Sequence, residues 1–316
     1  MKALILAGGF ATRLWPLTES RAKPLLLLDG KTILAHILEK VPLDMEVFLL
    51  TNKRFQNDFL IELKKLGRKN VQIFLEDAVS DGEKLGALGA ISACIDHYKI
   101  KEDIMVLAGD NLLPGLNFSN LVCREDNAKL AVRDIGDLYE ARKFGVVETQ
   151  DNKQLDIVGF EEKPEKPKST LISTGFMSFG RELLPMLQDF SKKEPDALGG
   201  IFPELLKKKI EVLAEPISGE WFDVGSFDTY LAAHKNLNPQ KENVIDGRVR
   251  NSELVGKVYI GEGAIVENSI IIDSIIYPGT KLIDCRISNT VIDEDCHFER
   301  VDLNSKLVRR NTKLKG

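Results

Sequence analysis

Two glycines and two basic residues near the N-terminus have the types and spacing to bind a polyphosphate. Gly8 and Gly9 directly follow the apolar run of residues 2–7. Because glycine has no Cβ atom, backbone N–H groups in such a loop can approach phosphate oxygens closely. Arg13 and Lys23 would add positive charge where negative charge builds on a leaving phosphate group. Their order, with a Pro-Leu-Thr turn between the two cations, predicts a phosphate-binding loop rather than an ordinary turn with solvated side chains.

Two common nucleotide-binding motifs are absent from the sequence. No G-x-G-x-x-G occurs, so the dinucleotide-binding fingerprint is missing. Gly30-Lys31-Thr32 resembles the end of a P-loop, but that motif needs a glycine at position 25, where this chain has leucine. We therefore disfavour a kinase or ATPase of the P-loop type.

Up to about residue 236 the sequence alternates between strand-like and helix-like segments. Short aliphatic runs predict strands, and apolar residues three to four apart predict amphipathic helices between them. This alternation favours an α/β fold with a Rossmann-like, mixed and mostly parallel sheet between helices. The predicted strands are residues 2–7, 46–50, 71–75, 104–108, 144–149, 157–160 and 176–179, and the predicted helices are 31–40, 55–66 and 85–98.

The pattern changes after residue 238. From about residue 249 aliphatic residues recur in steps of six, with Gly, Asn, Ser and Asp between them, which predicts a parallel β-helix. A β-sandwich is the alternative, but its strands would alternate by two and lie ~8–12 residues apart. We expect a first domain over 1–238 and a β-helix over 239–316. The two aliphatic series are Ile260, Val266 and Ile272, and Ile265, Ile271, Tyr277 and Ile283.

Composition excludes several classes of protein. The chain has 316 residues, 43% hydrophobic and 29% charged, as expected for a globular protein of one or two domains. A net charge of -5 argues against nucleic-acid or anionic-membrane partners. No apolar run reaches the ~18–20 residues of a membrane span, and we interpret the N-terminus as a buried strand rather than a signal peptide. Four cysteines without metal-type spacing suggest reduced thiols and a cytoplasmic location.

The N-terminal segment resembles the signature of the sugar-phosphate nucleotidylyltransferases, L-A-G-G-x-G-T-R-L-x-P-L-T followed by P-K-P-L. In this chain Ala11 replaces the third glycine and Ala22 the proline before the lysine. Ala11 adds a methyl group where the backbone nears the phosphates, so it either slows the enzyme or shifts the loop. Some members of the family carry a left-handed β-helix, as expected here. The resemblance implies nucleotide contacts by Leu6, Ala7, Gly8, Gly9, Thr12, Arg13, Lys23 and Gly86.

The resemblance extends to two carboxylates and implies a metal ion. Asp110, in Gly109-Asp110-Asn111, is similar to the family's metal-binding aspartate, and Asp223, in Trp221-Phe-Asp-Val-Gly, is similar to the second. Two carboxylates from distant segments suit a hard cation that bridges phosphates, so Mg²⁺ is the expected cofactor. The implied reaction is in-line attack by a sugar 1-phosphate on the α-phosphorus of a nucleoside triphosphate. Arg13, Lys23, Asp110 and Asp223 are the catalytic candidates, with Arg13 and Lys23 holding the departing pyrophosphate.

Further motifs are similar to the family's sugar pocket. The resemblance implies that Gly145 leaves room for the sugar ring and that Glu162 binds its hydroxyls. It also implies that Lys163 pairs with the sugar phosphate and that Gly175 completes the pocket. From the residues alone, Glu162 and Lys163 would be a solvated pair in a charged loop.

The substrates and the β-helix leave alternatives open. The glutamine that reads the base in relatives is missing, and an acidic segment over 76–83 replaces it. We expect dTTP or UTP with glucose 1-phosphate; guanylyl transfer to mannose 1-phosphate is the rival. A second interpretation is a weakly active regulatory homologue, suggested by Ala11 and Ala87. A third is an acyltransferase in the β-helix, where His297 is the only histidine that could act as its base. We expect the β-helix to stabilise the first domain and to mediate homo-oligomerisation.

Overall fold

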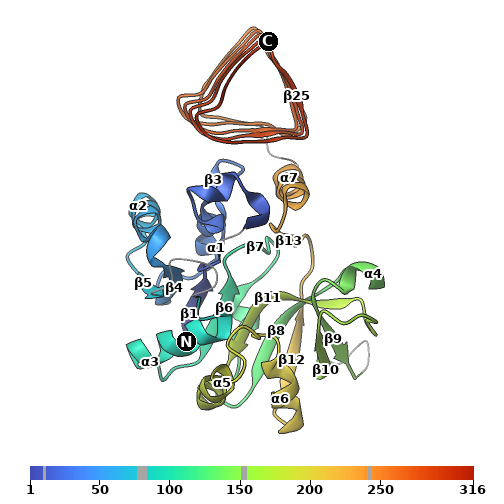
Figure 1. Ribbon diagram of the computed structural model, residues 1–316. Helices are drawn as coiled ribbons and strands as arrows, with labels where there is room; N and C mark the ends of the chain where they lie inside the picture. The colour runs from blue at the N-terminus through green and yellow to red at the C-terminus, as the bar shows by residue number, and fades with distance from the viewer. Residues whose placement is uncertain (10–11, 77–83, 151–154, 239, 241–242) are drawn as a thin grey trace. The chain divides into compact units, whose positions relative to one another are not determined.

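A mixed nine-stranded sheet forms the centre of the first of two compact units, which comprises residues 1–9 and 36–221. The computed structural model describes residues 1–9, 12–76, 84–150, 155–238, 240 and 243–316 (Figure 1). The strand order is β10-β9-β11-β6-β1-β4-β5, with β8 beside β11 and β12 beside β8. The strands are β1 (Lys2–Leu6), β4 (Val47–Asn52), β5 (Val71–Glu76), β6 (Ile104–Ala108), β8 (Ala128–Asp134), β9 (Gly145–Thr149), β10 (Ile157–Glu162), β11 (Leu171–Phe179) and β12 (Val212–Pro216).

The N-terminal half of this sheet is parallel, as the alternating pattern predicted. Strand β1 pairs in parallel with β4 and β6, and β4 pairs in parallel with β5. Beyond β6 the sheet turns antiparallel, because β11 runs against β6, β8 and β9. All seven predicted strands are present; β8 and β12, which pair with one another, were not predicted. The mixed sheet with helices confirms the predicted fold class of this part.

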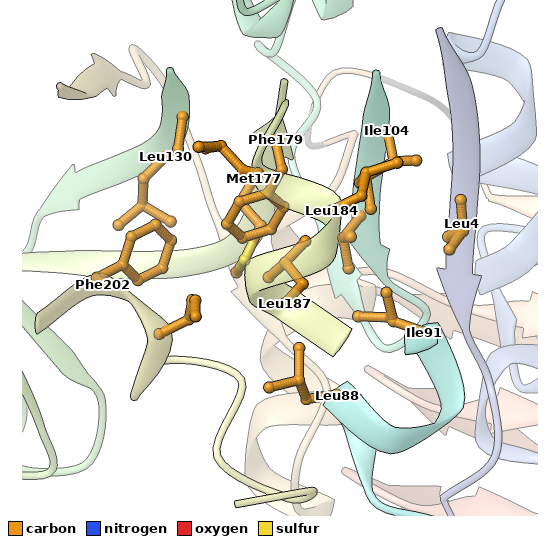
Figure 2. Close-up of a cluster of buried hydrophobic side chains, with 14 of the residues drawn as sticks. Leu4, Leu88, Ile91, Ile104, Leu130, Met177, Phe179, Leu184, Leu187 and Phe202 are labelled. Atoms are coloured by element: carbon orange, nitrogen blue, oxygen red, sulfur yellow. The ribbon is translucent and has the colours of Figure 1, made fainter. Parts of the chain in front are cut away.

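Helices α3, α5 and α6 cover one face of the sheet with a continuous apolar core. Side chains from these helices pack on strand residues of β1, β6, β8 and β11, as Figure 2 shows. The labelled residues are Leu88, Ile91, Leu184, Leu187 and Phe202 from the helices and Leu4, Ile104, Leu130, Met177 and Phe179 from the strands. The helices are α1 (Ile33–Lys40), α2 (Gln56–Leu66), α3 (Ala87–Tyr98), α4 (Leu138–Ala141), α5 (Leu184–Ser191), α6 (Ile201–Lys207) and α7 (Phe227–Asn236).

Nothing in the described part of the chain provides a helix long and apolar enough to cross a bilayer.

All four cysteines are buried free thiols. Burial raises the pKa of the Cys94 thiol to about 12, so this thiol stays protonated and unreactive at neutral pH.

The second compact unit comprises residues 10–35 and 222–316 and ends in a three-sided parallel β-helix. Figure 1 views this β-helix end on, as a triangle. Its three parallel sheets confirm the predicted β-helix and are consistent with left-handed winding. In chain order the sheets are β14-β17-β20-β23-β26, β15-β18-β21-β24-β27 and β16-β19-β22-β25. The strands are β14 (Val244–Ile245), β15 (Arg248–Arg250), β16 (Glu253–Val255), β17 (Tyr259–Ile260), β18 (Ile265–Glu267), β19 (Ile270–Ile272), β20 (Ile275–Ile276), β21 (Lys281–Ile283), β22 (Arg286–Ser288), β23 (Val291–Ile292), β24 (His297–Glu299), β25 (Asp302–Asn304), β26 (Leu307–Val308) and β27 (Lys313–Lys315).

Each of these coils contains fewer residues than the three steps of six that the sequence predicted. Val266 stacks on Leu282 and Leu282 on Phe298, so the register advances from 266 to 282 to 298. Inward residues therefore follow one another at steps of five or six, and the two predicted aliphatic series were wrong in part: Ile265 and Ile272 are only half-buried. The fully buried inward residues are Ile260, Val266, Ile271, Ile276, Leu282, Ile287, Ile292 and Phe298.

The corners of the β-helix need left-handed backbone, which explains the Gly, Asn and Asp residues between the aliphatic ones. These residue types adopt positive φ more readily than others. Asn268 and Asp284 occupy one corner with φ of 49° and 54°, followed there by Arg300 at 56°. The other two corners carry Gly256, Asp273, Asn289 and Ser305, and Gly263, Gly279, Asp295 and Asn311.

The N-terminal part of this unit consists of short elements. Strands β2 (Leu27–Leu28) and β3 (Lys31–Thr32) form a hairpin, and β13 (Phe222–Asp223) precedes α7. Ser226 caps α7 by accepting a hydrogen bond from the Thr229 N–H, and the Thr229 hydroxyl accepts one from the Ser226 N–H. The short 3₁₀ helices of this unit are η1 (Thr12–Leu14), η2 (Leu17–Glu19) and η3 (Lys23–Leu25).

A buried histidine on α7 makes the stability of this unit depend on pH. His234 is 1% exposed, and its Nε2 lies 3.1 Å from the Lys257 carbonyl oxygen. Burial lowers the pKa of His234 to about 4, from 6.5. Its contribution to stability is complete above pH 6.5 and is lost as the pH falls towards 4, because the unfolded chain then binds a proton that the folded chain does not.

We predict that wild-type protein loses about 2–3 kcal/mol of unfolding free energy between pH 7 and pH 4 through this histidine. The loss should be absent in His234→Gln, whose side chain does not titrate. Urea denaturation of both proteins across this pH range measures the difference. Parallel pH profiles of the two proteins would contradict the assignment.

Candidate active site

The Gly8-Gly9 loop lies at the carboxyl end of β1, and two buried side chains orient its peptide planes. Thr51 Oγ1 donates a hydrogen bond to the Ala7 carbonyl oxygen at 3.2 Å, and Asn52 Nδ2 donates one to the Gly8 carbonyl oxygen at 3.1 Å. In a trans peptide the C=O and N–H groups point in opposite directions. The N–H groups of Gly8 and Gly9 therefore point away from the end of β4, as an anion-binding loop requires.

Thr51 and Asn52 were not predicted as site residues. Both are almost completely buried, at 0% and 1% exposed. Asn52 Oδ1 also accepts a hydrogen bond from the Arg54 N–H, so its side chain is fixed at both ends. The sequence did contain a signal for these two residues. They are polar and directly follow the apolar run of the strand that pairs with β1.

The buried carboxylate of Glu76 lies beside this loop. A Cβ atom added to Gly8 would lie 2.9 Å from Glu76 Oε1, whereas one added to Gly9 would meet no atom within 4 Å. Glu76 ends β5, and its Oε2 accepts a hydrogen bond from the Leu85 N–H at 3.1 Å. Burial raises the pKa of Glu76, and the hydrogen bond from Leu85 partly offsets that effect. The rest of the acidic segment, residues 77–83, and Ala11 lie outside the described residues.

Asp110 follows β6 at the same edge of the sheet and is tied to Trp221 through one amide side chain. Asn111 Nδ2 donates to Asp110 Oδ1 at 2.9 Å, and Asn111 Oδ1 accepts from Trp221 Nε1 at 2.8 Å. The Trp221 ring in turn packs edge-on against Phe144. The amide orients the carboxylate, and sequence reasoning had given Asn111 no role of its own.

Gly175 lies against the segment that carries Asp110. Its φ is 82°, and an added Cβ atom would lie 2.9 Å from Ala108 Cβ. The preceding Thr174 is buried and donates a hydrogen bond to the Ala131 carbonyl oxygen at 2.9 Å. The structure thus brings Gly175, predicted for the sugar pocket, next to the segment that carries the predicted Asp110.

Gly145 and Glu162 face one another on the paired strands β9 and β10. A Cβ atom on Gly145 would lie 2.5 Å from Phe160 Cζ and 3.0 Å from Glu162 Oε2. A Cβ atom on Gly199 would lie 2.7 Å from the same carboxylate oxygen. Two glycines therefore leave the space that the Glu162 side chain occupies, and Gly199 was not predicted.

The other predicted residues of the first unit have definite places. Lys163 is exposed, has φ of 46°, and its Nζ lies 3.6 Å from Glu162 Oε1. Gly86 directly precedes α3 with φ of 78°, and an added Cβ atom would lie 2.6 Å from the Pro195 carbonyl oxygen. Packing against Pro195 is thus sufficient to explain a glycine at position 86. The contact of Gly86 with a nucleotide stays a prediction. Leu6 is the last residue of β1, and Ala7 directly follows it.

The second unit carries the remaining candidates. Arg13 and Thr12 belong to η1, with Arg13 exposed, and Lys23 begins η3 and is buried. Asp223 ends β13, and its carbonyl oxygen accepts a hydrogen bond from the Gly225 N–H at 2.9 Å. A Cβ atom on Gly225 would lie 3.4 Å from both Asp223 carboxylate oxygens, in ordinary van der Waals contact, so the carboxylate lies directly beside this glycine.

The donor chemistry fits magnesium rather than a transition metal. Asp110 and Asp223 offer carboxylate oxygens, and Mg²⁺ is bound through one or two carboxylates together with substrate phosphates. Over the described residues, no group of three or more His, Cys, Asp or Glu side chains forms a metal-binding cluster.

Comparison with known proteins gives a consistent result. The model of the nucleotidyl transferase family matches residues 2–240. The bifunctional protein GlmU of Methanocaldococcus jannaschii is 30% identical over 84% of this chain and 61% of its own length, so the chain spans less than two thirds of that protein. A glucose-1-phosphate thymidylyltransferase of Streptomyces griseus is 28% identical over 100% of this chain and 89% of its own.

A solved structure shows the same fold. It is the crystal structure of a Bacillus anthracis protein provisionally named a glucose-1-phosphate thymidylyltransferase. The TM-score is 0.64 at 24% identity, over 77% of this chain and 96% of that one. At this identity the likeness concerns the fold alone.

We predict that Gly145→Ala lowers the free energy of unfolding by about 1–3 kcal/mol, because the methyl group overlaps Phe160 and Glu162. Phe160 packs on Phe202 with ring centroids 5.1 Å apart, which limits its retreat. Gly9→Ala is the matched control and should change stability by less than about 0.5 kcal/mol. Chemical denaturation measures both, and equal stabilities would show that the pocket wall can shift.

Proposed function

Because the chain belongs to the nucleotidyl transferase family, we propose that it transfers a nucleotidyl group from a nucleoside triphosphate to a sugar 1-phosphate and releases pyrophosphate. The observation that carries this proposal is the Gly8-Gly9 loop, whose peptide planes are oriented by Thr51 and Asn52. The carboxyl edge of the parallel strands that presents this loop also presents Asp110, and open α/β sheets bind ligands at that edge.

The proposed mechanism relies on alignment and charge. The N–H groups of Gly8 and Gly9 bind the triphosphate, while Arg13 and Lys23 hold the β- and γ-phosphates as they depart. Lys163 orients the sugar phosphate for in-line attack on the α-phosphorus, and Glu162 binds sugar hydroxyls between Gly145 and Gly175. Asp110 and Asp223 would hold Mg²⁺, which when bound neutralises phosphate charge. Little covalent chemistry falls to the protein, so positioning supplies most of the rate.

For the substrate pair we propose dTTP or UTP with glucose 1-phosphate. The support is the sequence Asp110-Asn111-Leu112-Leu113 and the named function of the Streptomyces griseus relative. Glu76 favours a second candidate, guanylyl transfer to mannose 1-phosphate. Guanine presents adjacent N1–H and N2–H donors, which a carboxylate accepts together, whereas the single N3–H of thymine lies between two carbonyl oxygens that a carboxylate repels.

The remaining parts of the proposal come from the sequence. We propose residues 1–238 as the catalytic domain and 239–316 as a β-helix that takes part in homo-oligomerisation. A cytoplasmic location fits four buried thiols that form no disulfide.

We predict pyrophosphate release by the wild-type protein with one nucleoside triphosphate and one sugar 1-phosphate out of a panel of dTTP, UTP, GTP and ATP against glucose and mannose 1-phosphates. Asp110→Asn and Lys23→Ala should each lower kcat/KM by at least about 10²-fold, since each removes charge that the transition state needs. Coupled detection of pyrophosphate gives the rates. Near-wild-type rates in either variant would refute the residue assignment, and a panel without any turnover would refute the reaction.

The base preference provides a separate measurement. If Glu76 reads guanine, Glu76→Gln should lower kcat/KM for GTP relative to dTTP by about tenfold or more, because an amide offers only one acceptor to two donors. Glu204→Gln, on the surface of α6, is the control and should leave the ratio unchanged. An unchanged ratio in Glu76→Gln shows that Glu76 does not read the base and removes its support for the guanylyl candidate.

A further inference from the structure

One residue per coil of the β-helix contacts the segment that carries Arg13 and Lys23. Ile276 pairs with Ile292, and Ile292 pairs with Val308 in the next coil. The residues that directly follow these three, Tyr277, Asp293 and Arg309, therefore occupy the same position in successive coils. We call these three residues the contact row. All of them, and the segment of residues 12–28, belong to the second compact unit.

Asp293 binds the segment through a buried ion pair. Arg21 Nη2 lies 2.9 Å from Asp293 Oδ1 and 2.7 Å from Oε1 of the neighbouring Glu294. Asp293 is 0% exposed and Arg21 8%. The Arg21 guanidinium also lies over the Tyr277 ring, 4.6 Å from its centroid. Arg21 is thus held by two members of the contact row, close to Lys23 in the chain.

Tyr277 binds the segment on the other side of Lys23. Its hydroxyl oxygen accepts a hydrogen bond from the Leu27 N–H at 3.0 Å. The Tyr230 hydroxyl lies 2.9 Å from that of Tyr277 and donates to the Leu27 carbonyl oxygen at 2.6 Å. Both tyrosines are essentially unexposed. The chain is therefore fixed at residues 21 and 27, and Lys23 lies between these two points.

Arg309 reaches the earlier part of the segment. Its Nη2 lies 2.7 Å from Glu19 Oε2, and its guanidinium lies 4.8 Å from the centroid of the Trp15 ring. Trp15 follows Arg13 closely in the chain. The contact row thus touches the chain beside both cations of the proposed phosphate site.

These contacts are costlier than simple packing requires. Arg21 Nη1 and Asp293 Oδ2 are buried without a hydrogen-bond partner among the described residues. A buried ion pair often stabilises a fold no better than apolar residues of the same volume, but in some proteins it specifies a single geometry. Charged side chains at this position therefore indicate that the orientation of the segment matters, and not only its attachment.

We propose that the contact row is a positioning device, through which the β-helix sets the placement of Lys23 and Arg13 on the triphosphate. This inference rests on the proposed function for the role of the two cations. It assigns Arg21, Tyr277, Asp293 and Arg309 a positioning role in the reaction, although none of them needs to touch substrate. It also gives the β-helix a purpose within one chain, independent of self-association.

Three variants test the row on the full-length protein. Asp293→Asn keeps volume and removes the charge of the ion pair with Arg21. Tyr277→Phe keeps the ring and removes the hydroxyl contacts to Leu27 and Tyr230, and Arg309→Gln removes a half-exposed contact. Arg300→Gln is the matched control, because Arg300 is a similarly exposed arginine of the β-helix that pairs with Glu299. We expect kcat/KM for the nucleoside triphosphate to fall about tenfold in the row variants. KM for the sugar 1-phosphate and all kinetics of Arg300→Gln should stay at wild-type values.

Hydrogen–deuterium exchange of peptides from residues 12–28 provides a readout that needs no turnover. We expect faster exchange there in the row variants and not in Arg300→Gln. Wild-type kinetics in the row variants, or losses that affect both substrates equally and follow the melting temperature, would overturn the proposal. If Asp293→Asn fails to fold, Arg309→Gln and Tyr277→Phe decide the question.

The two proposals fail in different ways. A wild-type protein without turnover refutes the reaction, and the row proposal, which depends on it, falls with it even if exchange shows that the row holds the segment. A wild-type protein with turnover and a Lys23→Ala variant that is inactive, together with row variants at wild-type rates, refutes the row alone.

Discussion

Hydrogen bonding of β1 between β4 and β6 is the constraint on which the first unit depends. Because both pairings are parallel, the three strands end at one edge, with Leu6 level with Leu50 and Ala108. The chain must leave each strand there, and the residues that follow can serve a ligand. Gly8, Asn52 and Asp110 meet at this edge for that reason. Their chemistry becomes useful only because the register fixes which residue leaves the sheet first.

Glycines around this edge have a common physical role. At Gly8, Gly145 and Gly199 an added methyl group would meet a carboxylate oxygen or an aromatic ring within 3.0 Å. The glycines allow Glu76 and Glu162 to lie flat against the backbone.

The second unit combines a regular scaffold with an irregular segment. From β17 onward the coils of the β-helix stack in a constant register, so a position chosen in one coil recurs at a spacing of about 4.8 Å in the next. Such a row can hold a partner segment at several points, and residues 12–28 are that partner within the same chain. Buried polar atoms at the row are tolerated because aliphatic stacking within the coils, from Ile260 to Phe298, stabilises the scaffold independently.

The sequence by itself determined the alternating α/β pattern and the β-helix, and it named the candidate residues for phosphate and metal binding. These features depend on local periodicity and on residue chemistry, which are properties of neighbouring positions. The sequence did not reveal the true number of residues in a coil. Steps of five and of six residues between inward side chains cannot be distinguished until parallel pairing fixes the register. Strands β8 and β12 were missed for a similar reason, since each is a strand chiefly through its partner.

Only the tertiary structure decided which distant residues assist the predicted ones. Thr51 and Asn52 orient the glycine loop, Asn111 links Asp110 to Trp221, and Gly199 makes room for Glu162. Arg21 is an ordinary arginine in the sequence, and it becomes a buried anchor only because Asp293, from near the other end of the chain, lies against it. Periodicity and motif spacing carry no information about such pairs, because the free energy of a contact depends on distance in space and not on distance along the chain.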